Sequence, residues 1–438
     1  MKYPKYPAYK DSGVEWIGEI PNDWVLTQLK WTTSIMKGKV PKNIETDFSE
    51  TNDYLPYLSM EFLRGETSKQ WVRFDNSTFL VDEGETLLLW DGSNAGEFIK
   101  SRRGILSSTV ALVHCNKVNH NFLFYFCKAA EYKLKELTVG MGIPHVDGDL
   151  LKSLIMPFPL NEEQVSIGNF LDCKTAIIDR LVLKEQQIIN LLKAKRQSII
   201  TNSVTKGLDS KVPMKDSNVE WVGKIPEHWN IQKLKRIFQV LNGSTPRSDN
   251  PLYWNGNIIW VTPEDLSLTV SPVICKSSRQ ITAEGYDSCG TNLVPKGSII
   301  VSTRAPIGYV KISGVELCTN QGCRSLVKKT EANENYFFYY LYCFGSVLNS
   351  LGRGSTFAEL SSENLKMFQI SIPPIEEQLT ITQFLASETS KIDGLISKHL
   401  KLIDLLKEYK TSLITQAVTG KIDVRGFTLP TTSSDANQ

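Results

Sequence analysis

EEQVSIGNFLDCKTAIIDRLVLKEQQIINLLKAKRQSIITNSVT (residues 162–205) and EEQLTITQFLASETSKIDGLISKHLKLIDLLKEYKTSLITQAVT (residues 376–419) are two copies of one segment. At an offset of 214, 20 of their 44 positions are identical. Apolar residues recur in each copy at spacings of three, four and seven, the pattern of a coiled-coil seam. The predicted seam residues are Ile167, Leu171, Ile178, Leu181, Ile188, Leu192 and Ile199 in the first copy, and Ile381, Leu385, Ile392, Leu395, Leu402, Leu406 and Leu413 in the second.

Each copy therefore predicts one long helix with an apolar stripe. A single helix of this kind cannot shield its stripe from water by itself. We expect the two copies to pair with each other, and in antiparallel fashion, because each helix leads away from its own module. The two halves of the chain would then be related by a pseudo-twofold axis. A coiled coil formed with a different protein is the alternative.

A second repeat lies at the start of each half. Residues 10–30 (KDSGVEWIGEIPNDWVLTQLK) and 215–235 (KDSNVEWVGKIPEHWNIQKLK) share 12 of 21 positions at an offset of 205. The later copy directly follows the first helix. By the pseudo-twofold, the N-terminal copy should dock beside the end of the second helix, which makes the arrangement nearly circular. The repeated segments are expected to do the same job in both halves of the chain. The divergent segments between them are expected to do two different jobs of the same kind.

The divergent modules are predicted to be mostly β. Short apolar runs bounded by Gly and Pro indicate strands at 85–90, 108–115, 256–262, 297–303 and 323–329. Apolar and aromatic stretches at 119–137 and 333–352 indicate a helix late in each module. The predicted fold class is α+β: two mostly-β modules separated by two long antiparallel helices that form an intramolecular coiled coil, a pseudo-twofold tandem repeat. The predicted boundaries are 1–158 (first module), 159–206 (first helix), 207–372 (second module), 373–420 (second helix) and 421–438 (flexible C-terminal tail).

Composition narrows the class of protein. Hydrophobic residues make up 41% and the net charge is +2, both ordinary for a globular protein. No apolar run is long enough for a membrane helix and the N-terminus carries no apolar signal segment, so a cytoplasmic location is expected. The eight cysteines are scattered without metal-ligand spacing, which predicts reduced thiols in core positions and no metal site. With so little net positive charge, any DNA contact must rest on local patches or be shared with another subunit.

The second module carries a series of motifs that resembles a known family. In chain order they are NGSTP (242–246), YW (253–254), WVT (260–262), DL (265–266), GSII (297–300), STRAPIG (302–308), NQG (320–322), GSTF (354–357), LS (360–361) and PPIEEQ (373–378). In this order and spacing the module strongly resembles the target-recognition domain of specificity subunits of Type I restriction–modification systems (the HsdS family). The two-module, two-helix frame matches that family across nearly the whole chain.

The first module departs from this pattern. It has GKVP (38–41) in place of GSTP and lacks the Tyr-Trp pair, and WDGSNAG (90–96) stands in the loop position of STRAPIG. GMGIPHVDGDLLK (140–152) stands where the second module has GSTFAELSSENLK (354–366). These differences predict a conserved fold with a different base preference.

The resemblance implies a non-catalytic subunit that binds a bipartite, asymmetric double-stranded DNA target, one half-site per module. It implies that the paired helices hold the modules at a set separation and dock two methyltransferase subunits, which modify adenine, and that a motor-nuclease subunit can join. No cofactor is expected in this chain. S-adenosylmethionine is expected in the methyltransferase subunits, with ATP and Mg in the restriction subunits.

The candidate DNA-binding residues are polar and charged side chains in the divergent loops. Base edges in the major groove are read by Arg, Lys, Asn, Gln, Asp or Glu, and phosphates by Lys, Arg, Ser, Thr and backbone amides. Each could instead be a solvated loop residue or a strand-end hydrogen-bonding group. The candidates are Asp91, Ser93, Asn94, Lys100, Arg102 and Arg103 in the first module, and Ser244, Thr245, Arg247, Arg304, Asn320, Gln321 and Arg324 in the second. For Trp71, Trp254 and Trp260, core packing is favoured over stacking on DNA.

Two other classes of function compete with this hypothesis. A self-sufficient methyltransferase or nuclease would need motifs that the sequence lacks. There is no GxxxxGK[ST] phosphate loop, and Ile372-Pro373-Pro374-Ile375 has the prolines of an amino-methyltransferase motif without its polar and aromatic flanks. A non-DNA scaffold or adaptor, in which the coiled coil carries two interaction domains, is consistent with the near-neutral charge.

Overall fold

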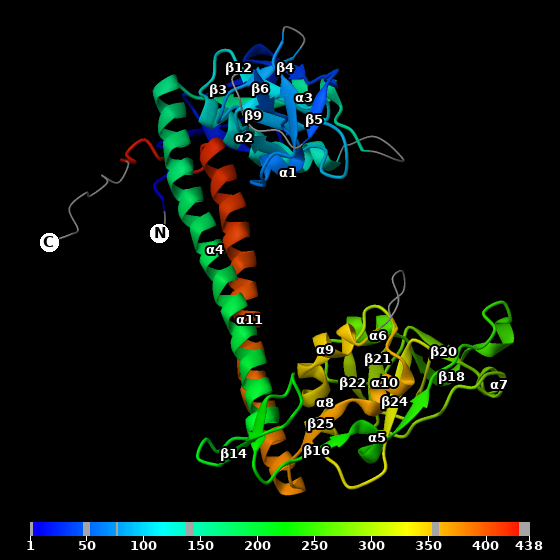
Figure 1. Ribbon diagram of the computed structural model, residues 1–438. Helices are drawn as coiled ribbons and strands as arrows, with labels where there is room; N and C mark the ends of the chain where they lie inside the picture. The colour runs from blue at the N-terminus through cyan, green and yellow to red at the C-terminus, as the bar shows by residue number, and fades with distance from the viewer. Residues whose placement is uncertain (1–2, 47–52, 76–77, 137–143, 353–358, 429–438) are drawn as a thin grey trace. The chain divides into compact units, whose positions relative to one another are not determined.

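The computed structural model describes residues 3–46, 53–75, 78–136, 144–352 and 359–428. These fall into two compact units (Figure 1). The first unit combines Met1–Gln186 with Leu400–Gln438, and the second is Gln187–His399. Each unit therefore contains one module, part of the first long helix and part of the second.

The module of the first unit is built on a four-stranded antiparallel sheet in the order β10-β9-β12-β4, with a three-stranded sheet β5-β7-β6 and smaller pairs β1-β2, β11-β8 and β13-β3. Its strands are β1 (Tyr9–Asp11), β2 (Glu19–Pro21), β3 (Val25–Gln28), β4 (Thr33–Lys37), β5 (Ile44–Thr46), β6 (Tyr54–Pro56), β7 (Gln70–Arg73), β8 (Leu80–Val81), β9 (Thr86–Leu89), β10 (Phe98–Lys100), β11 (Gly104–Ile105), β12 (Val110–Cys115) and β13 (Ile155–Phe158). Its helices are η1 (Leu29–Trp31), α1 (Met60–Leu63), α2 (His120–Glu136) and α3 (Gly148–Ser153).

The module of the second unit repeats this plan. Its main sheet has the order β17-β24-β21-β22-β19, beside a three-stranded sheet β20-β18-β23 and the pairs β14-β15 and β16-β25. The strands are β14 (Met214–Asp216), β15 (Lys224–Pro226), β16 (Asn230–Lys233), β17 (Phe238–Asn242), β18 (Trp254–Val261), β19 (Val273–Ile274), β20 (Arg279–Ile281), β21 (Ile299–Ser302), β22 (Val310–Ser313), β23 (Cys318–Thr319), β24 (Cys323–Lys328) and β25 (Gln369–Ile372). The helices are α5 (Leu234–Ile237), η2 (Pro251–Tyr253), α6 (Pro263–Leu268), α7 (Ala283–Asp287), α8 (Glu334–Cys343), α9 (Gly345–Ser350) and α10 (Ser362–Met367).

The two main sheets correspond strand by strand. The order β4-β12-β9-β10 in the first module matches β17-β24-β21-β22 in the second, which adds β19 at its edge by parallel pairing. The predicted strands at 85–90, 108–115, 256–262, 297–303 and 323–329 are confirmed as β9, β12, β18, β21 and β24. The predicted late helices are confirmed as α2 in the first module, and as α8 followed by α9 in the second.

The two long helices are α4 (Asn161–Lys206) and α11 (Ile375–Val418), and they pair in antiparallel fashion. In the first unit Asp179 of α4 accepts hydrogen bonds from Lys410 Nζ at 2.7 Å. In the second unit Arg196 Nε donates to Asp393 Oδ1 at 2.9 Å. In the repeated segment Asp393 is the copy of Asp179 and Lys410 is the copy of Arg196, so the same ion pair is made twice. The predicted intramolecular coiled coil is confirmed, with equivalent contacts in the two units.

The register of the seam was predicted correctly only in part. Ile167, Ile178, Ile381 and Ile392 are buried as expected, but Leu181, Ile188, Leu395 and Leu402 are 42%, 37%, 43% and 41% exposed. The neighbours Ile189 and Ile403 are buried instead, at 1% and 6% exposure. The prediction was wrong here because apolar residues stand side by side in the sequence, and a buried seam follows alternating steps of three and four residues. A second apolar stripe, beside the seam, is left on the surface.

A Trp-Glu hydrogen bond joins each copy of the short repeat (residues 10–30 and 215–235) to the start of a long helix. Trp24 Nε1 donates to Glu163 Oε2, and Trp229 Nε1 donates to Glu377 Oε2, both at 3.0 Å. These tryptophans are buried. Trp24 also lies beside Gly420, which follows the end of α11. The N-terminal copy thus docks at the end of the second helix, as the repeat predicted.

The EEQ triplet at the start of each helix also has a structural role. Gln164 Nε2 donates to Pro159 O at 2.8 Å, while its Oε1 accepts from the backbone N–H of Asn119 at 2.8 Å. Its copy Gln378 makes the same two bonds, at 2.9 and 3.0 Å. A buried side-chain amide that bonds with both its groups fixes the long helix to the start of the module's own helix.

Two expectations need correction. The predicted flexible tail from residue 421 begins inside the packed structure, because Ile422 and Val424 are buried and the backbone N–H of Asp423 donates to Pro4 O at 2.9 Å. Cys127, Cys318 and Cys323 are buried as predicted, but Cys275 is exposed.

In the part of the chain that the structure describes, no helix is long and apolar enough to cross a membrane.

Candidate nucleic-acid interface and helix surface

Three loops of the second module meet at one edge of its main sheet. Asn242 at the end of β17 pairs with Arg324 near the start of β24, and Ser302 at the end of β21 pairs with Cys323. The turn after β17, the loop after β21 and the loop before β24 therefore lie together. This brings six of the predicted residues to one place: Ser244, Thr245, Arg304, Asn320, Gln321 and Arg324.

Contacts between these loops hold the edge in one shape. Thr245 Oγ1 donates to Gln321 Oε1, and Ser244 N–H donates to Thr319 O at 3.0 Å. A side chain at Gly243 would place its Cβ 2.0 Å from Asn320 O, so only glycine permits this approach. Asn320 Oδ1 accepts from Gly322 N–H at 2.9 Å, which closes its own loop. The turn and the loop are thus a single surface.

A carboxylate joins the two arginines of this edge. Glu359 Oε2 lies 3.2 Å from Arg304 Nε, and Glu359 Oε1 lies 3.4 Å from Arg324 Nη2. Arg324 is 9% exposed and its Nη1 also donates to Gln321 O at 2.7 Å. Burial lowers the pKa of Arg324, and the carboxylate of Glu359 opposes that change. Arg324 therefore anchors the loop, whereas the Arg304 side chain is 47% exposed and open to a ligand.

Two tryptophans of the second module, Trp254 and Trp260, pack beneath this edge. Trp254 and Trp260 are buried and meet edge to face, with ring centroids 5.1 Å apart. Trp260 Nε1 donates to Ser244 O at 3.0 Å, which supports the turn from below. The guanidinium of Arg279, which the sequence analysis did not single out, stacks 3.5 Å from the Trp254 ring. Arg247 lies in the same turn, with an exposed side chain, and pairs with Asp249 at 3.0 Å.

The first module has a corresponding loop between β9 and β10. This position matches the loop between β21 and β22, as the sequence predicted for WDGSNAG. Asp91 pairs with Lys37 at 2.8 Å, and Ser93 and Asn94 are exposed. Lys37 was not predicted; it lies at the end of β4, the strand equivalent to β17, so the same kind of edge is formed. Residues 137–143, which include the start of the predicted GMGIPH segment, and residues 353–358, which include all of the predicted GSTF segment, lie outside the described residues.

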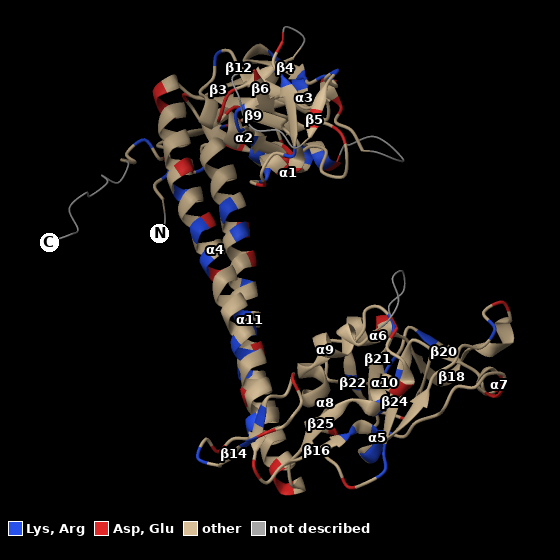
Figure 2. Ribbon diagram, viewed as in Figure 1, with Lys and Arg blue, Asp and Glu red and all other residues tan. Residues whose placement is uncertain are grey.

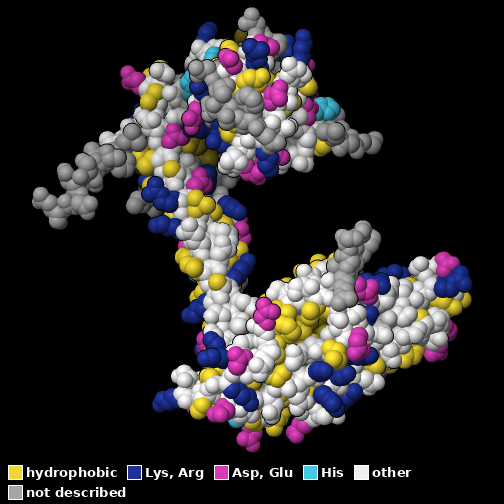
Figure 3. All heavy atoms as spheres, viewed as in Figure 1, with side chains coloured by type: hydrophobic (Ala, Val, Ile, Leu, Met, Phe, Trp, Pro, Cys, Tyr) yellow, Lys and Arg dark blue, Asp and Glu magenta, His cyan; other side chains and the backbone are white. Residues whose placement is uncertain are grey.

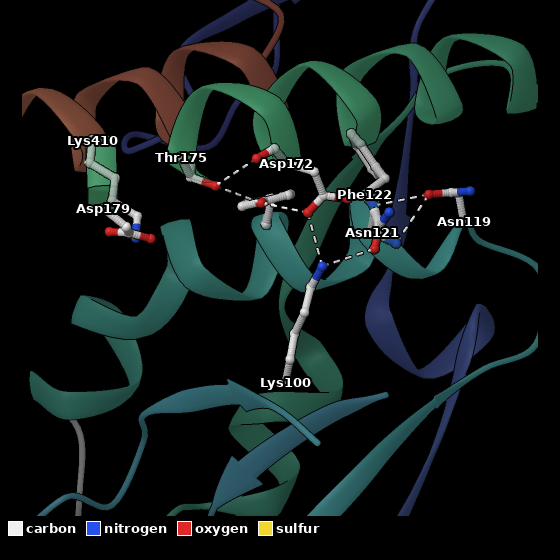
Figure 4. A network of polar contacts seen from close by, with 9 residues as sticks. Lys100, Asn119, Asn121, Phe122, Asp172, Thr175, Asp179 and Lys410 are labelled. Atoms are coloured by element: carbon white, nitrogen blue, oxygen red, sulfur yellow. Dashed lines mark hydrogen bonds and ion pairs between the residues drawn. The ribbon is translucent and has the colours of Figure 1, made fainter. Parts of the chain in front are cut away.

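The remaining candidates of the first module lie elsewhere. β10 runs antiparallel to β9, and Lys100 pairs with Thr86 at the opposite end of the strands from the Asp91 loop. Lys100 Nζ donates to Asp172 Oδ1 at 2.9 Å and to Asn121 Oδ1 at 3.1 Å (Figure 4). Lys100 therefore joins the sheet to α2 and α4. Closeness in sequence to the loop did not predict closeness in space.

Arg102 and Arg103 follow Lys100 in the chain, just beyond the end of β10. Arg102 Nη1 donates to Phe62 O at 3.1 Å and to Glu66 O at 3.2 Å, and its guanidinium stacks 3.9 Å from the Phe62 ring. These bonds fix the region around α1, so Arg102 is largely committed to structure. Arg103 is exposed. In both units Lys and Arg are interspersed with Asp and Glu, in keeping with local rather than continuous basic patches (Figure 2).

The long helices carry apolar residues outside the seam (Figure 3). They occupy equivalent positions of the two repeated segments. Leu181 and Leu395 are 42% and 43% exposed, Ile188 and Leu402 are 37% and 41% exposed, and Leu191 and Leu405 are 71% and 60% exposed. We call these three equivalent pairs the helix stripe. Exposed apolar groups that recur in register on a helix indicate a surface for a protein partner.

The helix surface also differs between the units. In the first unit a cavity of about 490 Å³ lies between α2, α4 and α11, with Lys128, Tyr132, Ile178 and Lys410 in its wall. In the second unit Tyr342 stands at the position equivalent to Lys128, and Arg196 Nη1 donates to its hydroxyl at 3.3 Å. At this position the first unit has a lysine in the wall of the recess, and the second unit has a tyrosine that is hydrogen-bonded to Arg196.

The fold and its loop edges define a tandem-repeat binding protein, with one structural frame used twice and two different loop surfaces. Residues 21–194 and 226–403 both match the family model described as "Type I restriction modification DNA specificity domain". The two matches cover most of the chain, so it belongs to the Type I restriction–modification DNA specificity family.

Individual relatives agree with this assignment. The MjaVIII specificity subunit of Methanocaldococcus jannaschii is 29% identical over 430 residues, 93% of this chain and 95% of the relative. The MjaIX specificity subunit of the same organism is 37% identical over 195 residues, 44% of each chain. The EcoR124I/EcoR124II specificity subunit of Escherichia coli is 25% identical over 219 residues, 47% of this chain and 50% of the relative.

Solved structures show the same fold. A chain from a structure of type I R-M complex assembly and conformational transition superposes with a TM-score of 0.71 at 15% identity, over 91% of this chain and 98% of that chain. The HsdS subunit from Thermoanaerobacter tengcongensis superposes with a TM-score of 0.51 at 14% identity, over 94% and 100%.

Proposed function

We propose that this specificity subunit reads a bipartite, asymmetric DNA target, with one half-site bound at the loop edge of each module. The observation that carries the proposal is the contrast between frame and edge. The sheets, the Trp-Glu pairs and the long helices are repeated, whereas the loops that meet at the sheet edges differ between the modules. An identical pair of edges would suit a palindromic target, and these edges are not identical.

We further propose that the helix stripe docks the methyltransferase subunits of a Type I complex. Its exposed apolar residues occur in equivalent pairs, which suits two copies of one partner related by a pseudo-twofold. Burial of leucine side chains provides the main favourable term in such an interface. The cavity in the first unit would make the two docking surfaces unequal in detail. A motor-nuclease subunit is a further expected partner.

In this proposal the chain itself is non-catalytic. Adenine methylation is performed by the docked subunits, which carry S-adenosylmethionine, and restriction by motor subunits that use ATP and Mg. The role of this chain is to place the bound target adenines within reach of those subunits. We also propose that the complex acts in the cytoplasm.

The proposal is tested by exchanging the first module. Residues 31–157 are replaced by the matching part of a family member of different specificity, and the chain is expressed with its methyltransferase subunit. Methylated adenines are then mapped by single-molecule sequencing. We expect a bipartite motif in which one half changes and the other is retained. A change in both halves, or in neither, would refute the assignment of one half-site to each module.

A further inference from the structure

The Arg304–Glu359–Arg324 cluster lies at the loop edge of the second module. The carboxylate of Glu359 is held by Arg324, which is 9% exposed and bonded to two backbone carbonyls, Gln321 O at 2.7 Å and Cys323 O at 3.0 Å. The other oxygen of the Glu359 carboxylate accepts a hydrogen bond from Arg304 Nε at 3.2 Å. The buried Arg324 thus holds the carboxylate of Glu359 in place, and that carboxylate holds the exposed Arg304.

Arg304 contacts Glu359 through its Nε atom and not through a terminal nitrogen. A guanidinium offers five N–H groups in a rigid planar fork. Because Nε is the atom bonded to Glu359, the terminal Nη1 and Nη2 groups are the donors of this 47% exposed side chain that the Glu359 contact does not use. Two parallel donors on a fixed plane match the O6 and N7 acceptors of a guanine edge in the major groove. An arginine held in this way loses less side-chain freedom on binding.

The charge of the cluster separates two kinds of DNA contact. Two arginines and one glutamate leave a net charge of one, and the negative group lies directly against Arg304. The carboxylate offsets part of the attraction between Arg304 and a phosphate, whereas a guanine edge carries no net charge and loses nothing by it. Phosphate contacts position a protein on DNA without reading its sequence, whereas a base contact needs a pair of donors held in one orientation. The arrangement therefore favours a base contact for Arg304.

We propose that Glu359 is a positioning residue that holds Arg304 to read a guanine in the half-site of the second module. The proposal rests on the proposed function, since it requires DNA at this edge. Arg324 supports Glu359 from beneath and makes no base contact. Loss of one such bidentate contact lowers discrimination at a single base pair by about 5- to 150-fold.

The test uses the full chain with its methyltransferase subunits. The target is first mapped for the unaltered protein, and binding is then measured against duplexes with each base of the second half-site replaced in turn. The variants are Arg304→Ala, Glu359→Ala, Glu359→Gln and the double variant. Glu363→Gln is the matched control, because it removes the same charge from an exposed position four residues along the chain.

We expect Arg304→Ala and Glu359→Ala to relax the same single guanine position and to leave the first half-site unchanged. The double variant should resemble Arg304→Ala alone, and the control should resemble the unaltered protein. Glu359→Gln retains one acceptor, so a partial loss at the same position is expected. The salt dependence of binding should stay unchanged in Arg304→Ala, because a base contact releases no counterion.

Three results would overturn the proposal. Arg304→Ala could weaken every sequence equally and lower the salt slope by about one, which identifies a phosphate contact. Glu359→Ala could strengthen binding to all sequences, which identifies Glu359 as a competitor of DNA. Arg304→Ala could also leave the second half-site fully specific. In each case a bipartite motif from the unaltered protein would leave the proposed function standing, and its absence would remove both.

Discussion

Replacement of Gly420 by alanine tests how the N-terminal segment closes the first unit. Gly420 follows α11 with a φ of +71°, a conformation that costs a residue with a side chain roughly 1–2 kcal/mol. A Cβ at this position would also lie 2.3 Å from Pro21 Cδ and 3.2 Å from the Trp24 ring. Overpacking of this kind typically adds about 1–3 kcal/mol. We therefore expect Gly420→Ala to weaken this contact by roughly 2–5 kcal/mol.

The glycine that follows the other long helix provides a control in the second unit. It stands one position out of register, because Gly420 aligns with Lys206 at the offset of 214, but it also faces a Pro-Trp pair, Pro226 and Trp229. Gly207 follows α4 with a φ of +73°. A Cβ at this position would lie 3.0 Å from Glu377 Oε1 and 3.4 Å from the Trp229 ring, and the Glu377 side chain can move to make room for it. Gly207→Ala should therefore show the conformational cost alone, roughly 1–2 kcal/mol. The difference between the variants isolates the steric contact with Pro21.

Hydrogen exchange of the full chain measures both effects locally. Peptides from residues 9–28 report on the first contact and peptides from residues 214–233 on its copy. A loss of about 1.4 kcal/mol accelerates exchange tenfold where local opening governs it. Gly420→Ala should accelerate the first set about 30-fold or more, and Gly207→Ala the second set about 5- to 30-fold. Equal acceleration in the two variants, or no change in residues 9–28, would refute the closure of the unit through Pro21.

Three further predictions concern single regions. Lys100→Ala should lower the melting temperature and leave the first half of the methylated motif unchanged, since Lys100 bonds to Asp172 rather than to DNA; an altered half-site on methylation mapping would contradict this. Leu181→Lys combined with Leu395→Lys should weaken methyltransferase binding about tenfold or more in titration calorimetry, with target preference retained in whatever complex forms; unchanged affinity would exclude this part of the helix stripe. Iodoacetamide should label the exposed Cys275 first and the buried Cys318 slowly, because burial raises the pKa of the Cys318 thiol to about 12. The order in which alkylated peptides appear in mass spectrometry tests this prediction.

Much of the candidate site followed from residue order, and the exceptions have specific causes. Thr245, Arg304 and Gln321 were identified because glycine and proline mark the loops that carry them. Lys100 was predicted as a DNA-binding candidate, but it lies at the other end of the sheet from the Asp91 loop, because antiparallel strands carry chain neighbours to opposite ends of a sheet. Glu359 was missed because it reaches the edge from a segment that follows α8 and α9, far along the chain from β24. Its contribution depends on a contact that no local pattern contains.

The frame of this protein was determined by its sequence alone. Repeated periodic segments must form helices, and their apolar stripes must pair, because burial of apolar surface depends on spacing that can be counted along the chain. The tertiary structure decided which of two adjacent apolar stripes became the seam, with Ile189 and Ile403 inside and Ile188 and Leu402 outside. It also decided which charged residues are free to bind and which are held. A hydrogen bond depends on distances of a few tenths of an ångström between atoms from distant segments, and only the folded chain sets those distances.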